Sequence, residues 1–297
     1  MLAIVIPYFK LFFFEETLRS LADQTDKRFK VYIGDDASPE NPESLLEKYQ
    51  DKFEFSYHRF GSNLGSTLLT QQWERSIKLA DNEPWLMILG DDDVLENNVV
   101  EEFYKKLNEV EREDISVIRF ATVKIDESSK LITKVHSHPK IEEAIDFLFR
   151  KTRSSLSEYV FLKSKVVEIG FKSFPLAWFS DVLAVLEFSD FKRIFTINSA
   201  ILKIRISNIN ISGKKDNLKL KSVAKFEYYY YLITNKSNYF AYSQRKILLS
   251  NLEKCYINDK KNGNFFLKIT KTYLLNFWIN DYFKFIQSIL NNYLKKK

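Results

Sequence analysis

The chain has 297 residues, of which 45% are hydrophobic and 28% charged, a composition that excludes intrinsic disorder for most of its length. The length fits one large domain or one domain with an appendage, and the single cysteine, Cys255, excludes an intramolecular disulfide and a cysteine-based zinc site and favours a reducing compartment. The net charge of +6 is unevenly divided: residues 1–200 carry 26 basic and 34 acidic side chains (−8), and residues 201–297 carry 19 and 5 (+14), which indicates two functional regions.

The N-terminus begins with a short apolar run, Leu2–Tyr8, that is rich in β-branched residues and is typical of a buried strand. It has no basic region before it and no small-residue cleavage site after it, and it is too short to span a bilayer. We therefore expect a cytoplasmic protein, with peripheral contact to the inner face of the membrane as an extension of that expectation.

The elements that follow alternate between helices and strands. Helical spacing is found over residues 15–23, 44–49, 67–80 and 99–107, and strands are expected at 29–33, 53–58, 85–89 and 116–123. This alternation predicts an α/β domain with a mostly parallel sheet.

Acidic clusters follow two of these strands, Asp35-Asp36 after the second and Asp91-Asp92-Asp93 after the strand at 85–89. Ligands bind at the carboxyl edge of such sheets, so we expect both clusters on one rim. Adjacent carboxylates raise one another's pKa, and a divalent ion with a preference for oxygen, Mg²⁺ or Mn²⁺, relieves that repulsion. A solvated turn that caps the next helix is the alternative.

The C-terminal third has a different character. Residues 218–256 and 265–294 carry aromatic and aliphatic residues at helical spacing with lysines between them, and a break is expected at 260–264. This basic region could be a solvated helical face, or it could meet an anionic membrane, nucleic acid or a phosphate-bearing ligand.

Four segments, taken in order, resemble the family 2 inverting glycosyltransferases: IPYFK, SLADQTDKRFKVYIGDDASPENP, SNLGSTLLTQQWERSIKLA and WLMILGDDDVLENN. The resemblance covers residues 1–125 and extends more weakly to 212. It implies a GT-A nucleotide-sugar-binding (Rossmann-like) α/β fold over residues 1–212, with 1–125 as the nucleotide-binding half and 126–212 as the acceptor-binding half. Residues 213–297 are then a basic, aromatic-rich helical C-terminal region.

The resemblance also implies which side chains meet the nucleotide. Asp36 would accept the imide N–H of uracil, and the other expected nucleotide-binding residues are Pro7, Tyr8, Phe9, Asp35, Asn63 and Gly65. The alternatives from the residues themselves are a strand stop for Pro7 and an Asx turn for Asp36.

The metal motif of the family is Asp-x-Asp, which this chain satisfies. The resemblance assigns Asp93 to the Mn²⁺ or Mg²⁺ ion that bridges the two phosphates, Asp92 to the donor sugar and Asp91 to the metal or the ribose. Arg205 is expected to meet the diphosphate, with plain surface charge as its alternative.

Inverting transfer needs a general base, which the family places near the start of a helix. Asp181 matches that place, with Trp178 against the acceptor or the sugar and Glu158 as a competing carboxylate on the acceptor side. Capping of the helix by Asp181 and a core position for Trp178 remain open.

The resemblance implies a metal-dependent hexosyltransferase that moves a sugar from a UDP-sugar to a hydroxyl of a saccharide or lipid-linked glycan, as in cell-envelope polysaccharide biosynthesis. We expect no nucleic-acid partner, and an anionic membrane contact through 214–297 and a homodimer stay open. The alternatives are a nucleotidyltransferase, disfavoured because IPYFKLFFFEE has no glycine, and a non-catalytic nucleic-acid- or membrane-binding protein, which leaves the acidic rim without a role.

Overall fold

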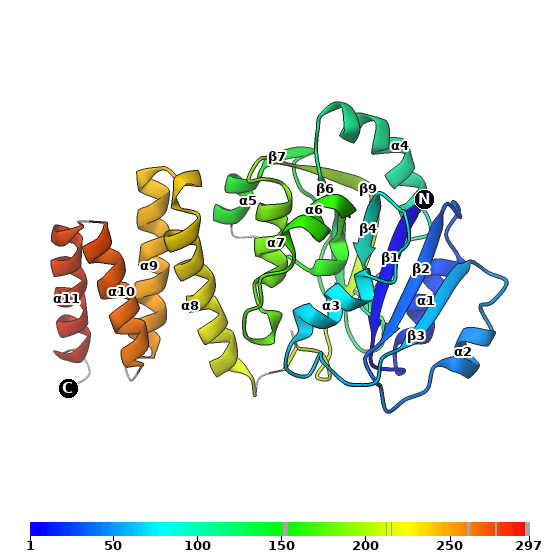
Figure 1. Ribbon diagram of the computed structural model, residues 1–297, viewed down its shortest axis with the longest axis horizontal. Helices are drawn as coiled ribbons and strands as arrows, with labels where there is room; N and C mark the ends of the chain where they lie inside the picture. Colours follow the sequence, from blue (N-terminus) through cyan, green and yellow to red (C-terminus); the bar gives the residue numbers. More distant parts are fainter. Residues whose placement is uncertain (151–153, 212, 215, 260–261, 277, 295–297) are drawn as a thin grey trace. The chain divides into compact units, whose positions relative to one another are not determined.

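The computed structural model of the chain describes residues 1–150, 154–211, 213–214, 216–259, 262–276 and 278–294 (Figure 1). The described residues form two compact units, Met1–Lys215 and Asp216–Lys297. Within these ranges every helix is too short or too polar to cross a membrane.

The described part of the first unit is built on a nine-stranded sheet with the strand order β3-β2-β1-β4-β8-β6-β9-β5, and β7 pairs with β9. The strands are β1 Leu2–Tyr8, β2 Phe29–Asp35, β3 Glu54–Arg59, β4 Trp85–Ile88, β5 Val94–Leu95, β6 Val117–Ile125, β7 Ile141–Glu143, β8 Tyr159–Leu162 and β9 Arg193–Arg205.

The direction of the strands divides the sheet. Strands β1 to β4 are mutually parallel, as the alternation predicts, and β6 runs parallel to β9. Strands β8, β5 and β7 run antiparallel to their neighbours, so the sheet is parallel over β1 to β4 and mixed beyond it. The order of helices and strands along the chain did not predict that these later strands run antiparallel to their neighbours.

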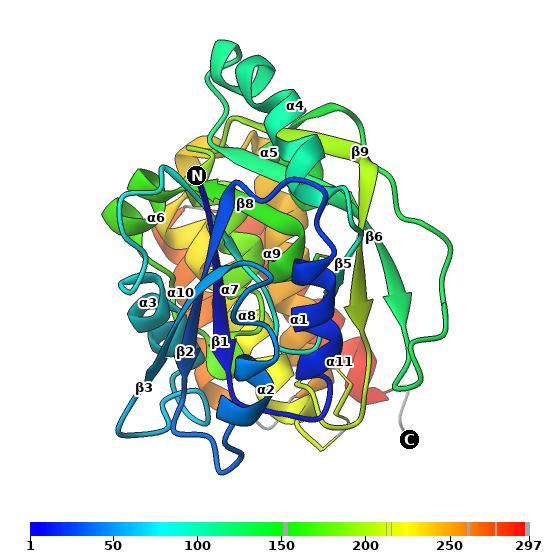
Figure 2. The same ribbon diagram turned by 90° about the vertical axis from the view of Figure 1, so that its right-hand side faces the viewer.

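Helices cover both faces of the sheet. The first unit contains α1 Phe14–Ala22, α2 Glu43–Glu47, α3 Leu69–Ile77, α4 Val99–Arg112, α5 Ala144–Phe149, α6 Lys163–Ile169, α7 Ser180–Phe188 and two short 3₁₀ turns, η1 Leu156–Glu158 and η2 Pro175–Ala177. Helices α1 and α3 lie on opposite sides of β1 and β2 (Figure 2).

The main core lies between the sheet and helices α1 and α4. Alternate residues of β1, such as Ile4 and Ile6, pack with Leu18 of α1 and Phe103 of α4, and all four are buried. Burial of a side chain of this size stabilises the fold by about 1.5–3 kcal/mol. This core fixes the positions at which the strands end.

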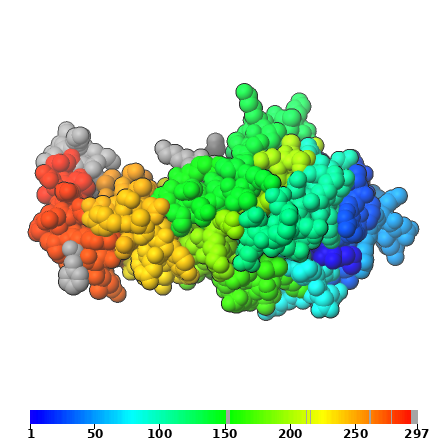
Figure 3. All heavy atoms as spheres, turned by 90° about the horizontal axis from the view of Figure 1, so that it is seen from above, coloured from blue at the N-terminus to red at the C-terminus, as the bar shows by residue number. Residues whose placement is uncertain are grey.

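The second unit is helical, as predicted, and its described residues form α8 Leu218–Asn235, η3 Ser237–Tyr239, α9 Tyr242–Asn258, α10 Gly263–Leu275 and α11 Ile279–Leu294. Its core is aromatic: the rings of Phe226 and Phe265 stack with centroids 3.8 Å apart. The helices form a close-packed body, yellow to red in Figure 3. The expected break at 260–264 falls between α9 and α10, although residues 260–261 lie outside the described ranges.

Candidate active site

The carboxyl end of β2 carries Asp35, which is fully buried. One of its oxygens accepts the backbone N–H of Ser38 at 2.7 Å, and the other accepts the Tyr57 hydroxyl at 2.6 Å and Arg59 Nη1 at 2.8 Å. Asp35 therefore joins the β2 turn to β3. Its burial and its partners support a role in shaping the turn rather than the direct nucleotide contact expected from the sequence.

The next residue, Asp36, holds a loop that lies far away in the sequence. Its two oxygens accept the backbone N–H groups of Leu64 and Gly65, both at 2.7 Å, and its carboxylate pairs with Arg75 of α3. A Cβ atom at Gly65 would lie 2.6 Å from Asp36 Oδ2, so this close approach requires glycine. The local turn contact expected as the alternative for Asp36 is made by Asp35 instead.

Asn63, in the same loop, accepts the N–H of Ser66 at 2.9 Å and closes the turn that presents Gly65 to Asp36. The guanidinium of Arg75, which pairs with Asp36, also lies 3.9 Å from the centre of the Phe60 ring.

The end of β1 separates into buried and accessible positions. Tyr8 is fully buried, packs on Phe14 with ring centroids 4.7 Å apart and donates its hydroxyl to the Glu40 carbonyl at 2.9 Å. Burial raises the pKa of this hydroxyl. Its surroundings therefore do not support the expected contact with the base, whereas Pro7 and Phe9 are half-buried at the strand end.

The acidic triplet after β4 is tied to β1 by its first member. Asp91 Oδ2 accepts the backbone N–H groups of Phe9 and Lys10, both at 2.8 Å. Burial, followed by the charge of Asp92, raises the pKa of Asp91 to about 6. Because β2, β1 and β4 are parallel neighbours, Asp36 and Asp91 follow strands that end at the same edge of the sheet.

Asp93 is buried and held on both sides. Its Oδ2 accepts the hydroxyl of Ser157 in η1 at 2.5 Å, and its Oδ1 accepts the backbone N–H of Arg205 at 2.9 Å. Burial, and then the charge of Asp92, raises the pKa of Asp93 to about 7. A Cβ atom at Gly90 would lie 3.1 Å from Asp93 Oδ2, so a small residue leaves room for the carboxylates.

Asp92 has a different environment, because it is half-buried and its Oδ2 accepts a hydrogen bond from Asn210 at 3.3 Å. Burial raises its pKa, an effect that Asn210 and nearby cations oppose.

Arg205 is 1% exposed, so the surface-charge alternative is wrong. Its guanidinium donates to the Asp92 carbonyl at 3.0 Å and to Glu16 at 2.8 Å, and its remaining bonds go to the Asp126 carbonyl and the Ser129 hydroxyl. These contacts indicate that Arg205 holds Asp92 and Asp93 in place, and they do not support the expected contact with the diphosphate.

The acceptor-side candidates lie around η1 and the start of α7. Glu158 is buried, its Oε2 accepts the N–H of Ser155 at 3.2 Å, and its Oε1 has no hydrogen-bond partner among the described residues. Burial raises the pKa of Glu158 to about 8, and the negative charge of Asp181 contributes to the rise. Asp181, in the first turn of α7, and Trp178, just before that helix, are half-buried.

The three aspartates after β4 can be examined as ligands of a divalent metal ion. Three carboxylates meet in a largely buried place, and burial with their mutual repulsion raises the pKa of each, which a cation would relieve. Each oxygen of Asp93 accepts one hydrogen bond and keeps a second lone pair. Within the described ranges, no group of three or more His, Cys, Asp or Glu side chains could by itself hold a metal ion. An ion bound by Asp91 or Asp93 would therefore need further ligands from outside the protein, such as phosphate and water.

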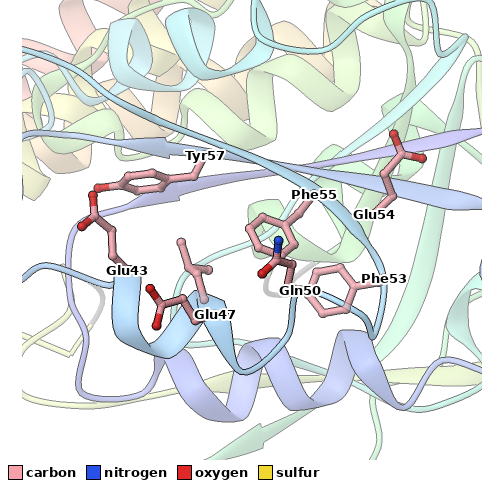
Figure 4. A pocket seen from close by; sticks show the side chains of 8 residues that line it. Glu43, Glu47, Gln50, Phe53, Glu54, Phe55 and Tyr57 are labelled. Atoms are coloured by element: carbon pink, nitrogen blue, oxygen red, sulfur yellow. The ribbon is translucent and has the colours of Figure 1, made fainter.

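A separate pocket of about 470 Å³ lies between α2 and the edge strand β3 (Figure 4). Its lining includes three glutamates, Glu43, Glu47 and Glu54, beside aromatic rings such as Phe55. It contains none of the residues that the sequence singled out.

Sequence reasoning missed Ser157, which holds both Gly90 and Asp93. Its hydroxyl accepts the Gly90 N–H at 3.0 Å and donates to Asp93. A serine in an irregular segment gives no signal of such a contact with a residue 64 positions earlier.

Comparisons with known proteins agree on a family. The family model described as glycosyl transferase family 2 matches residues 3–171. An uncharacterized glycosyltransferase MG060 homolog of Mycoplasma pneumoniae is 28% identical over 113 residues, which are 37% of this chain and only 35% of that protein.

Solved structures of Staphylococcus aureus TarS share the fold. TarS 1–349 in complex with UDP-GlcNAc matches with a TM-score of 0.62 at 16% identity, covering 97% of this chain and 81% of TarS 1–349. The same fragment in complex with UDP gives 0.56 at 12% identity, covering 100% and 92%. The similarity confirms the GT-A fold with its helical C-terminal region.

Proposed function

The chain belongs to glycosyl transferase family 2, and on that premise we propose that it transfers a sugar from a UDP-sugar to a hydroxyl of a saccharide or lipid-linked glycan, with inversion at the anomeric carbon. The observation that carries this proposal is the convergence of Asp36 and the Asp91–Asp93 triplet at the ends of parallel strands on either side of β1. The TarS complexes with UDP-GlcNAc and UDP support a uridine nucleotide as the donor. The family favours glycosyl transfer over the nucleotidyl transfer kept open above.

The nucleotide is proposed to lie against Phe9 and the loop of Asn63 and Gly65. Asp36 Oδ2 accepts one N–H from that loop, which leaves a lone pair for the imide N–H of uracil. Asp36 also pairs with Arg75, and a carboxylate can only accept hydrogen bonds. This favours a base with an N–H at the reading position.

Asp93 and Asp91 would hold Mn²⁺ or Mg²⁺, and Asp92 would contact the donor sugar. The ion, when bound, neutralises negative charge on the departing diphosphate. The protein groups around it keep the carboxylates in place: Ser157 and the Arg205 backbone hold Asp93, and two backbone N–H groups hold Asp91.

Asp181 is proposed as the general base. The acceptor oxygen attacks the anomeric carbon while the bond from that carbon to the UDP oxygen breaks, and Asp181 accepts the hydroxyl proton. Its place in the first turn of α7 suits a carboxylate, because a helix N-terminus stabilises negative charge. Trp178 would pack against the acceptor or the sugar. Glu158, whose pKa is about 8, is largely uncharged near pH 7 and suits an acceptor contact better than the role of base.

We propose that residues 1–125 bind the donor, that residues 126–212 bind the acceptor and that residues 213–297 have an accessory role. Exposed apolar side chains such as Leu267, Phe283 and Leu290, among many lysines, support contact of the last region with an anionic membrane carrying a lipid-linked acceptor. Vesicles of neutral and anionic lipid test this contact. Binding that requires anionic lipid and weakens with salt supports it, and equal or absent binding to both contradicts it.

The proposed donor is tested by thermal unfolding with UDP, GDP, CDP and TDP, each with and without Mn²⁺. A ligand at about 100 times its dissociation constant stabilises the folded state by about 2.7 kcal/mol. We expect UDP with Mn²⁺ to give the largest shift and Asp93→Ala to lose it. A larger shift with another nucleotide contradicts the uridine donor, and an Asp93→Ala variant with an unchanged shift contradicts the metal site.

A further inference from the structure

The donor diphosphate brings negative charge to a rim that already carries three aspartates. The three arginines near this rim each form an ion pair with a carboxylate of the protein: Arg205 with Glu16, Arg59 with Asp35 and Arg75 with Asp36. A cation that faces the diphosphate must therefore come from elsewhere on the rim.

Lys10 lies at that place. It follows the end of β1, the strand between β2 and β4, and its backbone N–H is fixed by Asp91 Oδ2 at 2.8 Å. Its side chain is half-buried, and its Nζ donates to the backbone carbonyl of Ile209 at 2.6 Å. The loop that follows β9 thus lies beside the end of β1, toward the lower edge of Figure 2.

The ammonium group of Lys10 retains binding capacity. Its hydrogen bond goes to a neutral carbonyl, and no carboxylate of the described residues forms an ion pair with it. An ammonium group has three N–H donors, so two remain.

We propose that Lys10 is a donor-binding residue whose ammonium group contacts the diphosphate of the nucleotide donor, between the end of β1 and the loop that follows β9. The inference rests on the proposed function, since it takes a nucleoside diphosphate as the ligand. A lysine ammonium is a compact point charge and a common phosphate ligand, and here it offsets the charge that the aspartates present to the phosphates. When no donor is bound, the ammonium group bonds to the neutral carbonyl of Ile209.

The test compares UDP with uridine, because only UDP carries the diphosphate. Dissociation constants for both are measured by titration calorimetry and ligand-observed NMR, at constant Mn²⁺, on the full chain and on Lys10→Met, Lys10→Arg and Lys48→Met. Lys48 is an exposed lysine of the same unit whose nearest carboxylate partner is Glu15 at 3.8 Å, so Lys48→Met makes the same charge change in a different setting.

We expect Lys10→Met to weaken UDP binding about tenfold or more and to leave uridine binding unchanged, as loss of a charged hydrogen bond would. Lys10→Arg should retain most of the UDP affinity, and Lys48→Met should match the unchanged chain. Unfolding midpoints of the variants confirm that they are folded.

Three outcomes are informative in different ways. UDP binding that is equal in the unchanged chain and Lys10→Met overturns the role of Lys10 and leaves the proposed function standing. Equal loss of UDP and uridine affinity in Lys10→Met also overturns it, because the effect is then not specific to the diphosphate. Failure of the unchanged chain to bind UDP overturns the proposed function and this inference together.

Discussion

The Ser157 hydroxyl lies 2.5 Å from Asp93 Oδ2 and 3.0 Å from the backbone nitrogen of Gly90, so one side chain of η1 holds the end of β4 at two points. The contact is buried and joins η1 to the loop after β4, two segments that are 64 residues apart in the chain. The position of Asp93, the candidate metal ligand, therefore depends on Ser157.

Ser157→Ala should destabilise the fold by about 1–3 kcal/mol, since it leaves a buried carboxylate oxygen and an N–H without their partner. It should also weaken binding of UDP in the presence of Mn²⁺. Urea unfolding and nucleotide titration measure the two effects. Ser137→Ala, at an exposed serine, is the control, and equal stability of the two variants would contradict the importance of this contact.

Gly65→Ala should lower nucleotide affinity about tenfold and destabilise the fold by about 1–3 kcal/mol, because the new Cβ would lie 2.6 Å from Asp36 Oδ2. Gly61→Ala, four residues earlier in the same segment, is a matched control, since nothing lies within 4 Å of a Cβ atom there. UDP titration and thermal unfolding check both variants. Similar losses in the two would show that general loop rigidity, not the contact with Asp36, is responsible.

Asp181→Asn should reduce transfer by about 10²–10⁴-fold while UDP binding persists, because an amide cannot accept the acceptor proton. Asp190→Asn is the control: that carboxylate pairs with Lys165 at 2.7 Å, and its backbone φ of 52° suits asparagine. Rates are measured as UDP release with donor and acceptor present. If Asp190→Asn loses activity and Asp181→Asn retains it, the assignment of the base is wrong.

Glu158→Gln should change how stability depends on pH. Burial raises the pKa of Glu158 from its ordinary value of 4.5 to about 8, so the folded state keeps a proton that the unfolded state releases. Ionisation of the unfolded chain therefore lowers the stability of the unchanged protein as the pH rises from about 4.5 to about 8, after which this contribution is constant.

Glutamine cannot ionise, so Glu158→Gln should gain stability relative to the unchanged protein between pH 5 and pH 8, by an amount on the order of a few kcal/mol. Urea unfolding at the two pH values measures the difference, with the exposed Glu168→Gln as the control. A difference that does not grow with pH would show that the carboxyl of Glu158 is ionised in the folded state.

The sequence predicted the fold well where the signal is local. Buried runs such as Leu2–Tyr8 and Trp85–Ile88 coincide with strands, because few structures other than a buried strand suit a short β-branched or apolar run between polar turns. The acidic motifs lie close to where they were expected, Asp35 as the last residue of β2 rather than after it and Asp91–Asp93 after β4. Helix ends were less certain, and α4 continues to Arg112, beyond the predicted end at 107.

The sequence could not distinguish residues that face a ligand from those that support them. Asp35 and Asp36 are adjacent and of one type, yet Asp35 is fully buried behind Tyr57 and Arg59, and Asp36 holds a loop from another part of the chain. Arg205 was expected at the diphosphate or on the surface, yet it is buried against Glu16. These differences arise from contacts between segments that are distant in the chain, which spacing along one segment does not encode.

The clamp that Arg205 makes on Asp92 and Asp93 sets a lower limit on the length of a working fragment. The family match ends at residue 171, but the backbone N–H that holds Asp93 Oδ1 belongs to residue 205, and the amide that meets Asp92 belongs to Asn210. During synthesis the acidic triplet therefore remains incompletely held until more than 110 further residues have been added, since Arg205 lies 112 positions after Asp93. Donor binding should be acquired late on the ribosome, as one of the last contacts of the first unit to form.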